Sequence, residues 1–169
     1  MSLKLRLIIM NFFQFFVWGA WMITIGNYWF STKQWASEDF GIIFSTMGIA
    51  SIFMPTLCGI IADRWINTEK LYGILHLLCG ATFMSLPMVD NPTTFFWVIL
   101  LGMIFYMPTL ALANSIAYSS LNKFNLDTVK HFPPIRVWGT VGFIAAMWVT
   151  NLTGNKASEN QFYIAGAAA

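Results

Sequence analysis

Charged residues are scarce in this sequence. Only 9% of its 169 residues are Asp, Glu, Lys or Arg, whereas about a quarter of an average soluble domain is charged. A water-soluble fold of this length needs more polar surface than such a composition provides, so the composition excludes an ordinary soluble domain. The formal net charge is +2, and the basic residues are scattered between apolar runs, which argues against nucleic acid as a partner.

Signatures of catalysis and of metal binding are also missing. The sequence has no HExxH motif, no glycine-rich phosphate loop and no GxSxG elbow. Its two cysteines, Cys58 and Cys79, lie in apolar stretches, where a small buried thiol is the ordinary role. We therefore predict a protein that is not an enzyme and holds neither a metal nor a cofactor.

Long apolar runs are what the sequence does contain, with 57% hydrophobic residues, 16 Phe and 8 Trp. A helix needs about 20 apolar residues to cross the hydrocarbon core of a bilayer. The pattern predicts an all-α integral membrane protein, with residues 1–169 forming one helical bundle. The predicted spans are near 7–30, 40–62, 71–89, 94–120, 135–153 and 161–169. Because the sixth run is still apolar at residue 169, we expect the chain to be truncated within that helix.

The loop charges predict an orientation. Six basic residues fall on one side of the predicted spans and two on the other; in chain order the first group is Lys4, Arg6, Arg64, Lys70, Lys123 and Lys130, and the second is Lys33 and Lys156. The positive-inside rule then places the N-terminus in the cytoplasm. Tyr28, Trp29 and Trp35 would form an aromatic anchor at the outer boundary of the membrane.

Two predicted spans carry polar side chains. On the first span, Gln14 and Trp18 lie close to the face that also holds Asn11, because steps of three and four residues return to the same side of a helix. The fourth span adds Asn114 and Tyr118, one turn apart. These residues either hydrogen-bond between helices or line a solute cavity, and the spacing leaves both interpretations open. We expect His76, the one histidine inside a span, to be a packing residue.

The fifth span begins with a polar stripe. Arg136, Thr140 and Phe143 stand at positions i, i+4 and i+7, so a helix presents a guanidinium, a hydroxyl and an aromatic ring on one side. The guanidinium supplies forked donors, the hydroxyl donates or accepts, and the ring stacks on a planar base. The alternative is an arginine at the cytoplasmic helix end that reaches toward the headgroups, with Pro133 and Pro134 marking the first helical turn.

Every acidic residue falls in or beside a predicted loop. Transport coupled to protons usually needs a carboxylate inside the membrane. If this protein couples transport to protons, we expect that carboxylate to come from sequence beyond these residues.

The segment from Gly59 to Trp65 contains Asp63 and Arg64 and resembles a degenerate form of the loop motif that follows the second helix in the major facilitator superfamily. Trp65 stands where the usual pattern has glycine, and the basic cluster is thinner. The resemblance implies that Asp63 and Arg64 act in conformational gating; the alternative is a loop ion pair without a role.

The whole chain resembles the N-terminal half of bacterial nucleoside:proton symporters. The matching stretches are Phe15 to Trp21, Gly48 to Pro55, Gly59 to Trp65, Tyr106 to Leu110 and Phe132 to Phe143. The resemblance implies that this chain is the six-helix N-terminal half of a twelve-helix carrier in the bacterial inner membrane, completed by a missing C-terminal half. It further implies a nucleoside as substrate, a proton as coupling ion, and Arg136, Thr140 and Phe143 at the nucleoside site. Gln14, Trp18, Asn114 and Tyr118 remain candidates for lining the same cavity. The alternatives are a carrier of another polar solute such as a sugar, or a membrane scaffold or sensor that does not transport.

Overall fold

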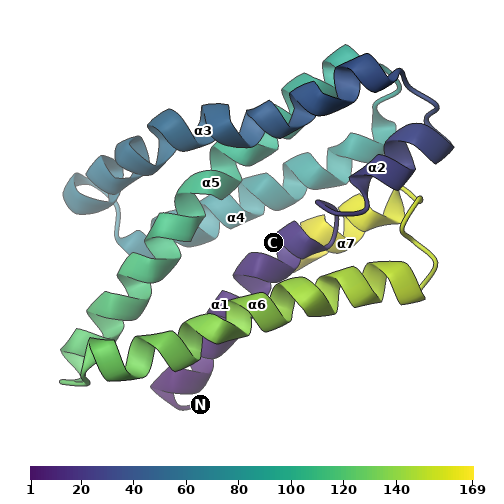
Figure 1. The fold of residues 1–169 in the computed structure, drawn as a ribbon. Coiled ribbons are helices and arrows are strands. Elements are labelled where there is room, and N and C mark those ends of the chain that lie inside the picture. The colour runs from purple at the N-terminus through teal and green to yellow at the C-terminus, as the bar shows by residue number, and fades with distance from the viewer.

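The computed structural model describes residues 1–169 and is entirely helical (Figure 1). In chain order the elements are α1 (Leu3–Gly19), α2 (Ile25–Asn27), the π-helix η1 (Tyr28–Thr32), α3 (Ser37–Arg64), α4 (Thr68–Ser85), the 3₁₀-helix η2 (Leu86–Met88), α5 (Pro92–Lys123), α6 (Thr128–Leu152) and α7 (Asn160–Ala168). Four segments are long and apolar enough to cross a membrane, namely α3, α4 together with η2, α5 and α6. The predicted all-helical membrane class is confirmed.

Side-chain caps mark where two of the long helices begin. The Asn91 carbonyl oxygen Oδ1 accepts from the backbone N–H groups of Thr93 at 2.9 Å and of Thr94 at 3.2 Å. The Asp127 carboxylate accepts from the N–H of Val129 at 2.9 Å. Such caps satisfy backbone donors that have no partner inside the helix. They allow short loops, so consecutive long helices run antiparallel.

The predicted run 7–30 does not form one continuous helix. α1 ends at Gly19 and the chain turns before α2 begins. The Ala20 carbonyl accepts hydrogen bonds from the hydroxyl of Thr24 at 3.4 Å and from that of Thr150 on α6 at 3.0 Å. These hydroxyls satisfy a carbonyl whose helical partner is lost in the turn. Because one of them comes from a distant part of the chain, hydropathy alone does not reveal the interruption.

The fifth predicted span starts earlier than expected, since α6 begins at Thr128 and not near residue 135. The loop before it shortens to residues 124–127. Pro133 and Pro134 lie inside the helix and not in its first turn. Each proline removes one backbone donor, but the carbonyls that lose a partner belong to exposed residues one turn earlier. The helix therefore continues across both prolines.

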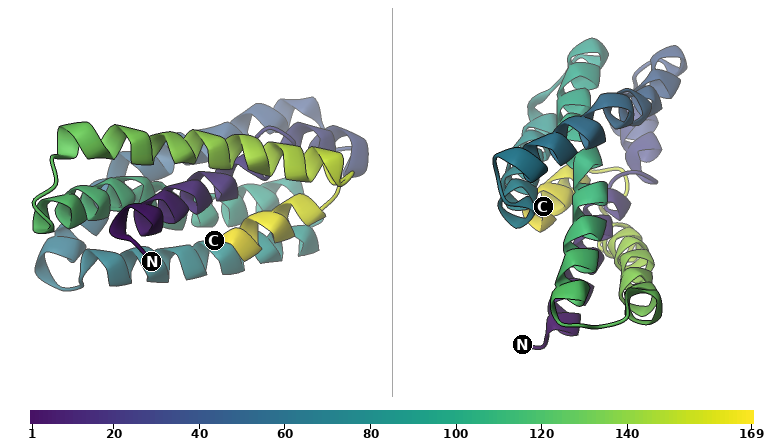
Figure 2. Two further views of the ribbon diagram at one scale, coloured as in Figure 1. Left: turned by 90° about the horizontal axis from the view of Figure 1, so that it is seen from below. Right: turned by 90° about the vertical axis from the view of Figure 1, so that its left-hand side faces the viewer.

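The helices α1 and α6 pack closely along much of their length (Figure 2). Glycines make this contact possible. A Cβ atom on Gly142 of α6 would lie 2.1 Å from the Phe12 carbonyl oxygen of α1, and one on Gly19 would lie 2.4 Å from the Phe143 carbonyl oxygen. No side chain fits at either position without displacing backbone, so these glycines determine how α1 lies against α6.

The other helices complete a bundle with an apolar exterior. α5 packs against both α3 and α4, and α7 packs against α4 (Figure 1). Large apolar side chains on the outside are well exposed, including Ile52 at 67%, Leu77 at 73% and Trp97 at 63%. Exposure of this kind is unfavourable in water and suits contact with lipid.

The aromatic residues predicted as outer membrane anchors are packed within the protein. Tyr28 and Trp29 are fully buried, and Trp35 packs against Trp29 with ring centroids 4.6 Å apart. Beside them the Lys33 ammonium donates to Asp90 at 2.5 Å. Burial alone lowers the pKa of Lys33, but the hydrogen bond to Asp90 and the nearby charges raise it above its ordinary value. This end of the bundle is therefore held by side-chain contacts between loops.

Candidate functional site

Arg136 and Thr140 line one cavity on the surface of α6. The cavity measures about 340 Å³ and is lined by Phe132, Pro133, Arg136, Val137 and Thr140. Arg136 is half-buried and Thr140 is exposed. The one ion pair of the protein, Lys33–Asp90, lies elsewhere, so the guanidinium has no carboxylate partner in this chain. The wall of this cavity therefore carries one cationic group and one hydroxyl.

Phe143, the third residue of the predicted stripe, does not line this cavity. It is half-buried and packs edge-on against Trp18 of α1, with ring centroids 6.4 Å apart. Trp18 in turn contacts Phe15 at 6.3 Å and Tyr106 at 6.0 Å. The predicted cavity residue Trp18 thus connects the ring of Phe143 to a group of aromatic side chains on α1 and α5.

Phe15 is the neighbour of Arg136 that the sequence analysis missed. The guanidinium carbon Cζ lies 4.0 Å from the centroid of the Phe15 ring. Periodicity does place Phe15 on the polar face of α1, since it follows Asn11 by four residues and precedes Trp18 by three. A phenylalanine in an apolar helix is so common, however, that its position alone gave no sign of a contact with an arginine.

Gln14 is at the centre of a buried polar network between three helices. Its Nε2 donates to the Thr109 hydroxyl of α5 at 2.8 Å, and its Oε1 lies 3.0 Å from the Nε2 of His76 on α4. The Tyr106 hydroxyl donates to the Gln14 backbone carbonyl at 2.5 Å. Gln14, Thr109 and His76 are all buried. The Gln14 side chain therefore forms hydrogen bonds between helices, and its partners are Thr109 and His76.

Replacing Thr109 by valine is expected to destabilise the protein by about 1–3 kcal/mol, because the Gln14 amide then becomes a buried donor without a partner. Thr82→Val is the matched control, since the Thr82 hydroxyl donates only to the Leu78 carbonyl of its own helix, at 2.8 Å. The thermal unfolding midpoints of the two purified variants in detergent should differ, with Thr109→Val the lower. Equal midpoints would show that the bond between helices contributes nothing measurable.

The remaining cavity candidates lie on α5. Tyr118 is 43% exposed, and its ring stacks on Phe132 with centroids 4.4 Å apart. Because Phe132 lines the Arg136 cavity, Tyr118 adjoins that cavity through this ring. Asn114 is half-buried one turn earlier on the same helix.

The predicted gating residues Asp63 and Arg64 are exposed in the last turn of α3. They form no ion pair with each other or with another residue. Both charges are therefore accessible at this end of the bundle.

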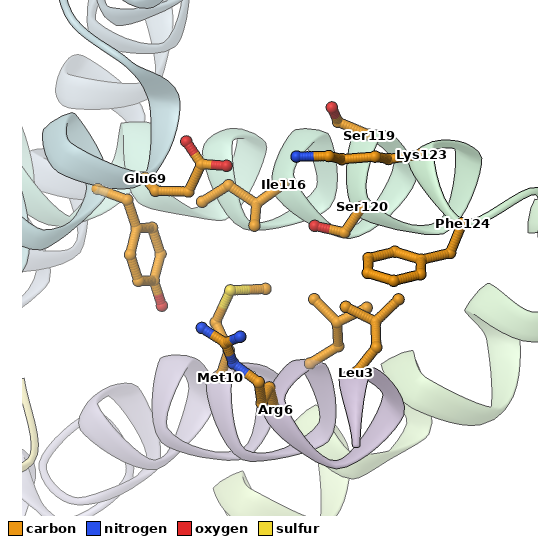
Figure 3. Close-up of a pocket in the computed structure, with 11 residues that line it drawn as sticks. Leu3, Arg6, Met10, Glu69, Ile116, Ser119, Ser120, Lys123 and Phe124 are labelled. Atoms are coloured by element: carbon orange, nitrogen blue, oxygen red, sulfur yellow. The ribbon is translucent and has the colours of Figure 1, made fainter. Parts of the chain in front are cut away.

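A larger cavity of about 500 Å³ lies between α1, α4 and α5 (Figure 3). Arg6, Glu69 and Lys123 contribute its charged groups. None of the residues predicted to bind substrate lines it. It shares no lining residue with the Arg136 cavity. No three His, Cys, Asp or Glu side chains in residues 1–169 lie close enough together to hold a metal ion.

Four long apolar helices and an exterior that suits contact with lipid define a multi-span membrane protein. Residues 1–169 match the family described as Nucleoside H⁺ symporter. The chain is 45% identical over 168 residues to the xanthosine permease of Escherichia coli (strain K12). The aligned residues cover 99% of this chain and 40% of that protein. The chain belongs to the nucleoside H⁺ symporter family.

Further relatives agree with this assignment. The nucleoside permease NupG of Escherichia coli (strain K12) is 45% identical over 167 residues, again covering 99% of this chain and 40% of that protein. The crystal structure of NupG superposes with a TM-score of 0.95 at 45% identity, covering 99% of this chain and 42% of that one. These relatives are transport proteins and not enzymes. The chain spans about two fifths of the length of the relatives it matches.

Proposed function

We propose that this chain is the N-terminal half of a carrier that transports nucleosides together with protons across the bacterial inner membrane. In this proposal six helices from this chain face six from a second half, and substrate is exposed to each side of the membrane in turn. Membership of the nucleoside H⁺ symporter family supports the coupling to protons. The names of the two relatives, a xanthosine permease and a nucleoside permease, support a nucleoside as substrate.

The observation that carries the substrate site is the Arg136 cavity. Its guanidinium has no carboxylate partner in this chain and shares the cavity with Thr140. Nucleosides carry ring nitrogens, carbonyls and ribose hydroxyls, which accept hydrogen bonds from a guanidinium and exchange them with a hydroxyl. We assign Arg136 and Thr140 to polar contacts and Phe143 to stacking on the base, with Trp18, Tyr118 and Asn114 at the margins. Gln14 contributes by holding α1 in place.

We infer that the N-terminus lies in the cytoplasm. In the antiparallel bundle the start of α1, the loop from α3 to α4 and the loop from α5 to α6 belong to the same end. This end carries six of the basic residues named above, and the opposite loops carry two. An excess of Lys and Arg in short loops favours the cytoplasmic side.

We propose that Asp63 and Arg64 act in gating at the cytoplasmic end. Both are exposed and without an ionic partner in this chain, so they are available to contact the second half in one conformation and to release it in another.

The proton-carrying residue is proposed to lie in the second half. All seven carboxylates of this chain are at helix ends or in loops, and a carboxylate that couples transport to protons must reach the central cavity.

Uptake by membrane vesicles that contain the intact carrier tests this proposal. Labelled uridine and adenosine should accumulate when the outside is acidic, and accumulation should stop when an ionophore collapses the proton gradient. A labelled sugar serves as the control for another polar solute. Gradient-driven uptake of the sugar but not of nucleosides would show that the substrate is a sugar. Uptake equal to that of vesicles without the carrier would contradict transport altogether.

A further inference from the structure

We propose that Phe15 is a positioning residue for substrate recognition, whose ring holds the Arg136 guanidinium at the wall of its cavity. This inference rests on the proposed function, because it concerns the geometry of the same site. It adds Phe15 of α1 to the Arg136 cavity, whose lining residues all lie on α6.

The contact between the two side chains is direct. Arg136 Cζ lies 4.0 Å from the centroid of the Phe15 ring, well inside the range of about 6 Å in which a cation is attracted to an aromatic face. Contact with a ring face uses none of the five N–H donors of the guanidinium. Phe15 therefore restrains Arg136 and leaves its N–H donors free for a nucleoside. A carboxylate partner would instead compete with the nucleoside for these donors.

Gly139 provides the space for this contact. A Cβ atom at this position would lie 2.6 Å from Phe15 Cδ2 and 2.8 Å from Arg136 Nη1. A side chain at residue 139 would therefore displace both partners at once. The absence of a side chain lets the ring of α1 reach across α6 to the guanidinium one turn away.

The position of the ring is itself determined by close backbone contacts. Gly142 contacts the backbone of Phe12, and Gly19 contacts the backbone of Phe143, so α1 meets α6 closely at residues on either side of Phe15. Phe15 also contacts Trp18, which packs against Phe143. The ring thus has little freedom to move, and a long flexible arginine side chain loses part of its own freedom by lying on it. The entropic cost of ordering Arg136 when substrate binds is therefore lower than it would be for an unrestrained side chain.

The test compares uptake kinetics of the full-length carrier with the variants Phe15→Leu and Phe15→Tyr. Phe15→Leu is expected to raise the KM for uridine about two- to tenfold, because the substrate must then order an unrestrained Arg136 side chain. The maximal rate should stay within about twofold, because the change acts on binding. Phe15→Tyr keeps the ring and should restore most of the affinity. Phe13→Leu is the matched control on the same helix; Phe13 is 46% exposed and does not contact Arg136.

The outcomes separate this inference from the function on which it rests. If Arg136→Ala loses uptake while Phe15→Leu keeps a normal KM, the positioning role is wrong and the proposed site stands. A lower maximal rate and a lower unfolding midpoint in Phe15→Leu, with KM unchanged, would mean that the ring is only structural and would also overturn the inference. If Arg136→Ala itself transports normally, the proposed site fails first.

Discussion

Arg136→Ala is expected to lower the ratio of maximal uptake rate to KM for uridine by about 10- to 100-fold, which corresponds to the loss of one hydrogen bond from a charged donor. The guanidinium lies in a cavity with Thr140 and has no ionic partner in this chain. Its removal should therefore cost substrate contacts and not a structural ion pair. Initial rates of labelled uridine uptake by vesicles measure the effect.

Two further variants complete this test. Arg136→Lys keeps the charge but loses the planar fork of donors, so we expect uptake between that of the wild type and of the alanine variant. Ile144→Ala, on the same helix and 43% exposed, controls for expression and membrane insertion. Wild-type uptake in Arg136→Ala, at equal amounts of inserted protein, would remove this residue from the site.

Gly142→Ala is expected to destabilise the bundle by about 1–3 kcal/mol or more, since it forces extra volume into a close-packed contact. The added methyl carbon would lie 2.1 Å from the Phe12 carbonyl oxygen, and a backbone atom moves aside only if the whole helix shifts. We expect a lower thermal unfolding midpoint in detergent and less protein in the membrane.

Gly48→Ala is the matched control for this prediction. A Cβ atom on Gly48 of α3 has nothing within 4 Å, and alanine favours a helix over glycine. Its midpoint should equal or exceed that of the wild type. If both alanine variants unfold at the same temperature, the packing of α1 against α6 does not depend on the close contact at Gly142.

The sequence does not show which of these two glycines lies in a close helix contact. Both lie in apolar helices, and in the sequence they look alike. Gly142 faces a neighbouring backbone and Gly48 faces open space, and only the arrangement of the helices distinguishes them.

The candidate site was partly predictable for the same reason. Helical spacing places Arg136 and Thr140 on one side of a helix, and the structure puts both in one cavity. Phe143 follows the same spacing but packs against Trp18 outside that cavity. Phe15 reaches Arg136 from another helix, and no spacing within one segment reports such a contact.

The sequence by itself determined the class of the protein and the approximate position of most helices. Runs of about 20 apolar residues are stable in only a few environments, and inside a bilayer the backbone must satisfy its own hydrogen bonds within the segment. The tertiary structure decided the turn after Gly19, the early start of α6 and the partners of Gln14, because each depends on groups far apart in the chain. Local hydropathy selects the helix, whereas the contacts that end it, bend it or orient its polar side chains come from whichever helix lies beside it.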